Sequence, residues 1–216
     1  MICWIASFPN SGSTLVRQLI QQVFQLPTWS QYLESEPAEL FDIHCSRFAQ
    51  NWTPSLYRQI TVDKQTWFVK THDAPIDEQP AIYVVRNGID CHLALSKFWA
   101  MPVHPIIAGA YTHPFPNWSG MWRLWGQWRQ GQLLLLRYEE ILADWRPAAT
   151  AISEFLGVEQ KAEFVNDPQA ARERWHQIFR TNWWDRSDFD EQTERLFWDL
   201  HGSAMMELGY GSEKGK

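Results

Sequence analysis

Short apolar runs alternate along the chain with longer stretches in which apolar residues recur at helical spacing. Residues 2–8 form the first apolar run, which ends at the small and polar residues 9–12. In residues 13–24, which follow, apolar side chains recur every three or four positions, as in an amphipathic helix. A buried strand, a turn of small residues and a helix are typical of the opening of an α/β nucleotide-binding unit.

The same patterns predict the remaining elements. Further strands are expected at residues 66–69, 81–85 and 133–136, and helices at 37–62, 89–99, 118–128, 147–156 and 189–208. Gly157 is expected to end the helix at 147–156. Prolines make residues 100–117 irregular, and residues 211–216 read as a disordered tail.

The alternation of strands and helices predicts a single domain over residues 1–210. We expect a three-layer α/β fold, with a central, mainly parallel sheet and helices on both faces, similar to P-loop NTPases. Ligands of such sheets bind at the carboxyl ends of the strands. The polar segments that follow the predicted strands are therefore expected to meet in one crevice: 9–14, 70–72, 86–87 and 137–138.

Charge and cysteine content narrow the class of protein. A net charge of −6 argues against a nucleic-acid or polyanion binder, so an anionic ligand needs a local positive site. Cys3, Cys45 and Cys91 form neither a disulfide framework nor a metal-binding pair. The first residues lack a signal-peptide pattern, and no apolar run approaches a membrane span. We expect a soluble cytoplasmic protein without stable membrane insertion, and the sequence does not fix its oligomeric state.

The turn between the first strand and the first helix reads SFPNSGST over residues 7–14. The unpaired N–H groups and the dipole of a helix N-terminus form an anion site. Ser11, Ser13 and Thr14 add hydroxyl donors, and Gly12 allows close approach of the backbone. In the P-loop pattern GxxxxGK[ST] a lysine stands where this chain has Ser13, which argues against NTP hydrolysis. The alternative is structural, with Ser11 or Ser13 only capping the helix.

Charged residues follow two of the predicted strands. Lys70 and His72 lie two positions apart at a strand end, so both side chains can face one crevice. Histidine accepts a hydroxyl proton near neutral pH, and lysine stabilises charge on a transferring group. Arg86 leaves a buried strand and can bind phosphate through two hydrogen bonds. The alternatives are a solvated strand end for Lys70 and His72, and an ion pair with Asp90 or another acidic residue for Arg86.

Taken in order, these segments resemble the family of sulfotransferases that use 3′-phosphoadenosine 5′-phosphosulfate (PAPS). FPNSGST at 8–14 resembles the family's phosphosulfate loop YPKSGTT, and KTH at 70–72 its catalytic-histidine segment. VVRNGID at 84–90 is similar to the VxRN(P/G)xD segment. Two later family segments are matched by LRYEEI at 136–141 and ISEFLG at 152–157. The resemblance runs in family order from residue 2 to about residue 158.

The resemblance implies a role for each matching residue. The residues implied to hold the 5′-phosphate and sulfate are those of the loop: Asn10, Ser11, Gly12, Ser13 and Thr14. Arg86 would bind the 3′-phosphate, and Tyr138 would lie near the nucleotide. His72 would be the general base, and Lys70 would neutralise charge on the sulfuryl group or position the acceptor. PAPS would be the co-substrate, 3′-phosphoadenosine 5′-phosphate (PAP) the product, and no metal would be required.

The loop departs from the family pattern at Asn10. The family has a lysine there, which stabilises the leaving phosphate, whereas an amide donates a hydrogen bond without charge. Lys70 or Arg17 are the candidates to compensate. Arg17 lies one turn into the predicted helix, and its alternative place is the helix surface.

The 3′-phosphate segments also depart from the family pattern. Eight residues after Arg86, where the family has a phosphate-binding serine, this chain has Ala94, and Ser96 is the nearest serine. Of the family's late RKG segment, Arg180 alone is left as a second 3′-phosphate ligand. Its alternative is an exposed arginine.

The acceptor is expected to be a small hydrophobic molecule or lipid with a hydroxyl, because residues 100–122 and Trp183-Trp184 are aromatic and poor in charge. His104 and His113 have no carboxylate or cysteine at ligand spacing, so no metal site is expected. Two alternatives stay open. Asn10 and the degraded RKG segment also fit a PAP-binding protein of this fold that has lost catalysis, and a P-loop nucleotide kinase is disfavoured by the missing lysine.

Overall fold

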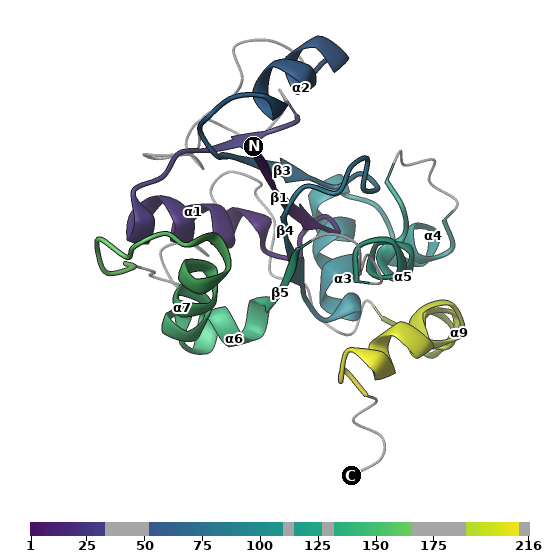
Figure 1. Cartoon of the computed structure of the whole chain (residues 1–216). Helices are drawn as coiled ribbons and strands as arrows, with labels where there is room; N and C mark the ends of the chain where they lie inside the picture. The colour runs from purple at the N-terminus through teal and green to yellow at the C-terminus, as the bar shows by residue number, and fades with distance from the viewer. Residues whose placement is uncertain (33–51, 110–114, 127–131, 166–188, 212–216) are drawn as a thin grey trace.

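Parallel strands form the central sheet of the computed structural model, which describes residues 1–32, 52–109, 115–126, 132–165 and 189–211 (Figure 1). The strands are β1 (Ile2–Ser7), β2 (Thr28–Ser30), β3 (Trp67–Thr71), β4 (Ala81–Val85) and β5 (Leu133–Arg137). Their order is β2-β3-β1-β4-β5, and every neighbouring pair is parallel. Parallel neighbours require crossover connections, which place helices on the faces of the sheet.

Helices cover both faces of the sheet (Figure 1). One face carries α1 (Ser13–Phe24), α6 (Tyr138–Ala143) and α7 (Trp145–Leu156). The other carries α3 (Gly88–Trp99), α4 (Val103–Ile107), α5 (Trp118–Met121), the π-helix η2 (Trp122–Gly126) and α9 (Glu191–Glu207). The helix α2 (Pro54–Thr61) adds Leu56 and Ile60 to the core of this second face. The three-layer α/β fold that the sequence predicts is confirmed.

The side chains of β1 alternate between two cores. Ile2, Trp4 and Ala6 belong to the core that includes residues of α3, α5 and α9, whereas Cys3 and Ile5 belong to the core that includes residues of α1 and α7. All residues of the strand are buried. A strand buried on both faces appears in the sequence as a continuous apolar run, which is why residues 2–8 predict it well. Its packing fixes the place from which the following loop starts.

The register of the sheet brings the carboxyl ends of four strands to one edge. β1 lies between β3 and β4, and Ala6 of β1 pairs with Thr71 of β3. On the other side Val85 of β4 pairs with Arg137 of β5. The segments that follow β1, β3, β4 and β5 therefore start at the same edge, as the expected crevice requires.

The sequence pattern does not predict β2, because Thr28 and Ser30 are polar although they are buried. The Thr28 hydroxyl oxygen accepts hydrogen bonds from Arg17 Nε at 3.1 Å and from Gln21 Nε2 at 2.9 Å. The side chains of α1 thus hold this short strand in place. Arg17 is fully buried, so the alternative that it lies on the helix surface is wrong.

Several other elements also differ from the prediction, among them α6, which the sequence pattern does not predict. β3 continues to Thr71, so it includes Lys70. α4 lies within the segment 100–117 that was expected to be irregular, because Val103 and Ile107 are buried and anchor it. The helix expected at 118–128 divides into α5 and the π-helix η2. A Cβ on Gly126 would lie 2.1 Å from a ring carbon of Trp122, so the side chain of Trp122 occupies that space.

Several expectations fall on residues outside the described ranges. Of the helix expected at 37–62, the structure describes α2 and not residues 37–51. Cys45, His113 and the pair Trp183-Trp184 are also outside those ranges, as is most of the expected tail, residues 212–216. Within the described ranges, no helix combines the length and the apolar character needed to cross a membrane.

Candidate active site

The loop after β1 leads into a helix N-terminus without a side-chain cap. Asn10 and Gly12 both have a left-handed backbone, with φ of 63° and 104°, and Ser11 N donates to the Phe8 carbonyl at 3.1 Å. Gly12 is the N-cap of α1, and no side chain in the described part of the chain caps it. The alternative that Ser11 or Ser13 caps the helix is therefore wrong. The first-turn N–H groups are suited to binding an anion.

Tyr138 lies directly against this loop. A Cβ on Gly12 would lie 2.4 Å from Tyr138 Cδ2, so the tyrosine ring touches the backbone of the loop. Tyr138 is the first residue of α6, immediately after β5. The structure thus brings the end of β5 to the end of β1, as the sequence predicts for these segments.

Arg86 connects the end of β4 to the same loop. Its Nη1 donates to the Asn10 carbonyl at 3.1 Å, and its guanidinium carbon lies 4.6 Å from the centre of the Tyr138 ring. A guanidinium over an aromatic face is a favourable cation–π contact. The ends of β1, β4 and β5 therefore meet at Arg86, beside the N-terminus of α1.

Cys91 lies beneath the loop and was not among the residues that the sequence indicates. Its Sγ is 3.2 Å from Ser11 Oγ, and it also contacts the carbonyls of Asn10 and Arg86. Burial raises the pKa of the Cys91 thiol to about 12, so it is uncharged at neutral pH. Its position in the first turn of α3, five residues after Arg86, is the signal that places it near the loop.

His72 follows β3 directly and has a fixed orientation. Its Nδ1 lies 2.6 Å from the Ser7 carbonyl oxygen and 3.4 Å from Ser7 Oγ. A carbonyl oxygen only accepts hydrogen bonds, so Nδ1 carries the proton and Nε2 has the basic lone pair. Lys70 and His72 are each only 7% exposed. The alternative of a solvated strand end is therefore wrong for both residues.

Aromatic side chains enclose His72. The Tyr32 ring is stacked on the imidazole, with centroids 5.5 Å apart and planes at 13°, and Phe115 meets the imidazole edge-on at 5.4 Å. The His72 backbone N–H donates to the Tyr32 hydroxyl at 2.7 Å. Burial raises the pKa of the adjacent Asp73, and the Tyr32 hydroxyl partly offsets this effect. Tyr32 and Phe115 lie about forty residues from His72 in the sequence, so no local pattern could indicate them.

The other expected nucleotide ligands are placed as follows. Ser11 and Ser13 are buried at the start of α1, and Thr14 is partly exposed there. The Ser96 hydroxyl donates to the Met101 carbonyl after the end of α3, a contact that competes with ligand binding. Arg180 lies outside the described residues.

No group of three or more His, Cys, Asp or Glu side chains in the described ranges is arranged to hold a metal ion. His104, which the sequence singles out, instead approaches Thr193 of α9, with Nδ1 3.1 Å from the hydroxyl oxygen.

A parallel sheet with an anion-binding turn after its first strand defines the P-loop-like class of nucleotide-binding folds. The family model of the sulfotransferase domain matches the sequence of residues 3–172, so the chain belongs to the sulfotransferase family. The resemblance inferred from the sequence is confirmed. No significant match was found among curated proteins.

Solved structures share the fold at low sequence identity. Mouse sulfotransferase SULT7A1 complexed with PAP has a TM-score of 0.63 and 16% identity, over 97% of this chain and 86% of that chain. Retinol dehydratase in complex with androsterone and inactive cofactor PAP has a TM-score of 0.54 and 16% identity, over 94% and 80%. Retinol dehydratase in a complex with retinol and PAP has a TM-score of 0.55 and 16% identity, over 94% and 81%. At this identity the similarity establishes the fold.

Proposed function

We propose that this chain transfers the sulfuryl group of PAPS to the hydroxyl of a small hydrophobic acceptor, with His72 as the general base. The contact of 2.6 Å between His72 Nδ1 and the Ser7 carbonyl carries the proposal. It leaves Nε2 as the basic nitrogen. Ser7 ends β1 and leads into the loop at the N-terminus of α1. The same strand end therefore orients the base and starts the proposed phosphosulfate site.

The proposed reaction is an in-line displacement at sulfur. His72 Nε2 accepts the hydroxyl proton while the acceptor oxygen forms a bond to sulfur, and the bond from sulfur to the 5′-phosphate oxygen breaks. The electron pair stays on that oxygen, and PAP leaves. In this proposal the N–H groups at the start of α1 and the ammonium group of Lys70 stabilise the charge that develops on the departing phosphate and the sulfuryl group.

The arrangement around Arg86 supports an assignment of the nucleotide ligands. We assign the 5′-phosphosulfate to the backbone and hydroxyls of residues 10–14 and the 3′-phosphate to Arg86. Stacking on Tyr138 and the bond to the Asn10 carbonyl hold the guanidinium beside the loop, so little side-chain entropy is lost on binding. Arg180 and Ser96 stay predictions, and the Met101 contact weakens the case for Ser96.

The surroundings of His72 support a hydrophobic acceptor. Tyr32 and Phe115 present aromatic surfaces to the imidazole, and a pocket of this kind favours an apolar body that carries a single hydroxyl. The retinol dehydratase structures contain androsterone and retinol, which are molecules of this class. A phenol such as 2-naphthol is therefore the first acceptor to test.

The test compares His72→Gln with the wild type, using PAPS and 2-naphthol without magnesium. Loss of a general base lowers kcat by at least about 100-fold, whereas the PAP affinity measured by calorimetry should not change. Tyr57→Phe is the control, because the Tyr57 hydroxyl donates to Asp77, which precedes the amino end of β4, whereas the proposed site lies at the carboxyl ends of the strands. Full activity of His72→Gln would remove His72 from the mechanism.

Asn10 favours one alternative, a PAP-binding protein of this fold that has lost catalysis. That alternative requires tight PAP binding by the wild type without transfer to any phenol or alcohol. Consumption of ATP that depends on magnesium would instead support a P-loop kinase, since the proposed sulfuryl transfer needs no metal.

A further inference from the structure

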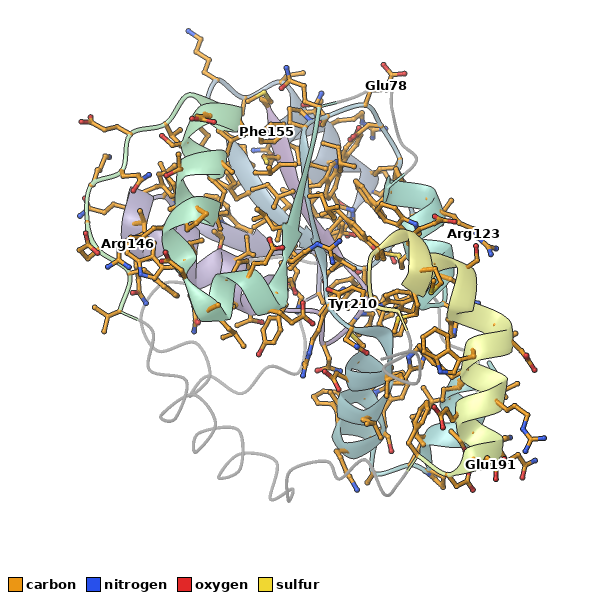
Figure 2. The ribbon with its side chains drawn as sticks, turned by 90° about the horizontal axis from the view of Figure 1, so that it is seen from below. Glu78, Arg123, Arg146, Phe155, Glu191 and Tyr210 are labelled. Atoms are coloured by element: carbon orange, nitrogen blue, oxygen red, sulfur yellow. The ribbon has the colours of Figure 1, made fainter. Side chains whose placement is uncertain are left out.

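The C-terminal segment turns back onto the proposed nucleotide site. After α9, Gly209 has a left-handed φ of 72°, and Tyr210 N donates to the Met205 carbonyl at 2.8 Å. These features reverse the chain at the end of the helix. Figure 2, in which Tyr210 is labelled, shows this residue between the end of α9 and the sheet. Its hydroxyl donates to Glu139 Oε2 at 2.8 Å.

Glu139 uses its second carboxylate oxygen to hold the turn after β4. Oε1 accepts a hydrogen bond of 2.9 Å from the backbone N–H of Asn87. Asn87 follows Arg86 directly, and its side chain caps α3 by accepting from Ile89 N at 2.9 Å. One carboxylate thus joins the end of the chain to the backbone next to the proposed 3′-phosphate ligand.

The neighbour of Glu139 holds the side chain of the same arginine. Tyr138 lies under the Arg86 guanidinium, 4.6 Å from its carbon atom. The two consecutive residues therefore hold Arg86 in different ways. Tyr138 contacts the Arg86 guanidinium, and Glu139 binds the backbone of Asn87, which follows Arg86. A displacement of Glu139 would affect both contacts, because both residues begin α6.

The Tyr210 hydroxyl keeps its proton and can donate a hydrogen bond, because it is buried and lies next to the Glu139 carboxylate. Burial and the nearby Glu139 raise the pKa of Tyr210, so the phenol is protonated at neutral pH. The Arg137 guanidinium lies over the Tyr210 ring, 5.2 Å from its centre. Hydrogen bonds that involve a charged partner are stronger and more directional than neutral ones.

We propose that Tyr210 is a positioning residue for the 3′-phosphate, and that it acts through Glu139 and Asn87 on Arg86. The inference rests on the proposed function, which assigns the 3′-phosphate to Arg86. With Tyr210 in place, the turn that carries Arg86 is ordered before the nucleotide binds, so binding loses less conformational entropy. When the Tyr210 hydroxyl is removed, the turn is less ordered. The affinity for a ligand with a 3′-phosphate should then fall more than the affinity for a ligand without one.

The test measures the affinities of PAP and ADP by calorimetry for the wild type and for Tyr210→Phe. We expect PAP to bind about three- to tenfold more weakly to the variant, the size of effect that positioning residues have on a distant contact. ADP lacks the 3′-phosphate, so its affinity should not change. Tyr57→Phe is the matched control, because the Tyr57 hydroxyl donates to Asp77 Oδ2 at the same distance, 2.8 Å, and Asp77 precedes the amino end of β4, whereas Arg86 follows its carboxyl end.

A second variant distinguishes the proposed positioning role of Tyr210 from a general loss of stability. Glu139→Gln should lower the ratio of PAP to ADP affinity in the same direction, and the double variant with Tyr210→Phe should lose less than the sum of the two effects. An unchanged ratio in Tyr210→Phe, with a lower Tm like that of Tyr57→Phe, would show a purely structural role and overturn the inference. If the wild type itself does not prefer PAP to ADP, the assignment of Arg86 fails, and the proposed function fails with it.

Discussion

The ring of Tyr138 lies so close to Gly12 that a methyl group on this glycine would be 2.4 Å from Tyr138 Cδ2. The two residues come from α6 and from the loop before α1, which are more than a hundred positions apart in the sequence. Their contact joins the loop proposed to bind the phosphosulfate to the ring that supports Arg86. A change at Gly12 should therefore disturb both parts of the nucleotide site.

Gly12→Ala should weaken PAP binding by more than about tenfold, because the added Cβ must displace the Tyr138 ring that supports Arg86, and the backbone strain of about 1–2 kcal/mol falls within the loop proposed to bind the phosphosulfate. Gly157→Ala is the control, since Gly157 also has a left-handed φ, of 65°, and no described atom lies within 4 Å of its added Cβ. The control should lower Tm without changing PAP affinity, as measured by calorimetry. Equal PAP affinity in both variants would contradict the proposal that the loop at Gly12 binds the nucleotide.

Asn10→Lys tests whether the missing loop charge limits the rate. A charged hydrogen bond to the leaving phosphate is worth about 1–2 kcal/mol more than a neutral one, which corresponds to roughly a tenfold higher kcat. Asn10 has a φ of 63°, which asparagine tolerates better than lysine, so Tm should fall. Rates with PAPS and 2-naphthol and a thermal melt measure the two effects. A stable variant without a rate gain would indicate that Lys70 already supplies the charge.

Because two histidines are buried in the folded protein, we expect the protein to lose stability in acid. His92 and His201 have ring centroids 5.1 Å apart, and burial lowers their pKa values from 6.5 to about 4 and about 3. For His201, the charges of His92 and Arg123 lower the pKa further. The unfolded chain takes up protons at these sites below pH 6.5 while the folded protein does not. Their contribution is therefore complete above pH 6.5 and is lost as the pH falls from 6.5 toward 4 and 3.

At pH 5 each histidine should reduce the free energy of unfolding by about 2 kcal/mol relative to neutral pH. Urea unfolding at pH 7.5 and pH 5 measures the change. His201→Leu should show a smaller difference between the two pH values than the wild type, because one of the two groups is removed. Equal midpoints for the wild type at both pH values would contradict the assignment of these histidines as neutral and buried.

The apolar pattern of the sequence predicts those helices and strands whose positions are determined mainly by the burial of apolar side chains. The helix Ser13–Phe24 and the strand Ala81–Val85 have the predicted bounds, because their apolar residues face a core and their ends coincide with turns. β2 could not be predicted in this way, since Thr28 is buried through hydrogen bonds from Arg17 and Gln21. Satisfied polar groups can lie in a core without leaving an apolar pattern in the sequence.

The candidate site was predictable to the extent that its residues follow strand ends. The loop, Arg86, His72 and Tyr138 could be named because parallel topology brings such positions together. The contacts of Tyr32 with His72 and of Tyr210 with Glu139 could not be named. They depend on how distant segments pack, and neither tyrosine has a distinctive sequence context.

Cys91 lies against the hydroxyl of Ser11, in the turn that we propose to bind the phosphosulfate. Oxidants and alkylating agents react with the thiolate, and this thiol is both fully buried and held in its neutral form. The sulfur can react only when the residues that cover it, including the turn at Asn10 and Ser11, move away. The reactivity of Cys91 is therefore an internal measure of how firmly the loop is held, and it requires neither a substrate nor an attached label.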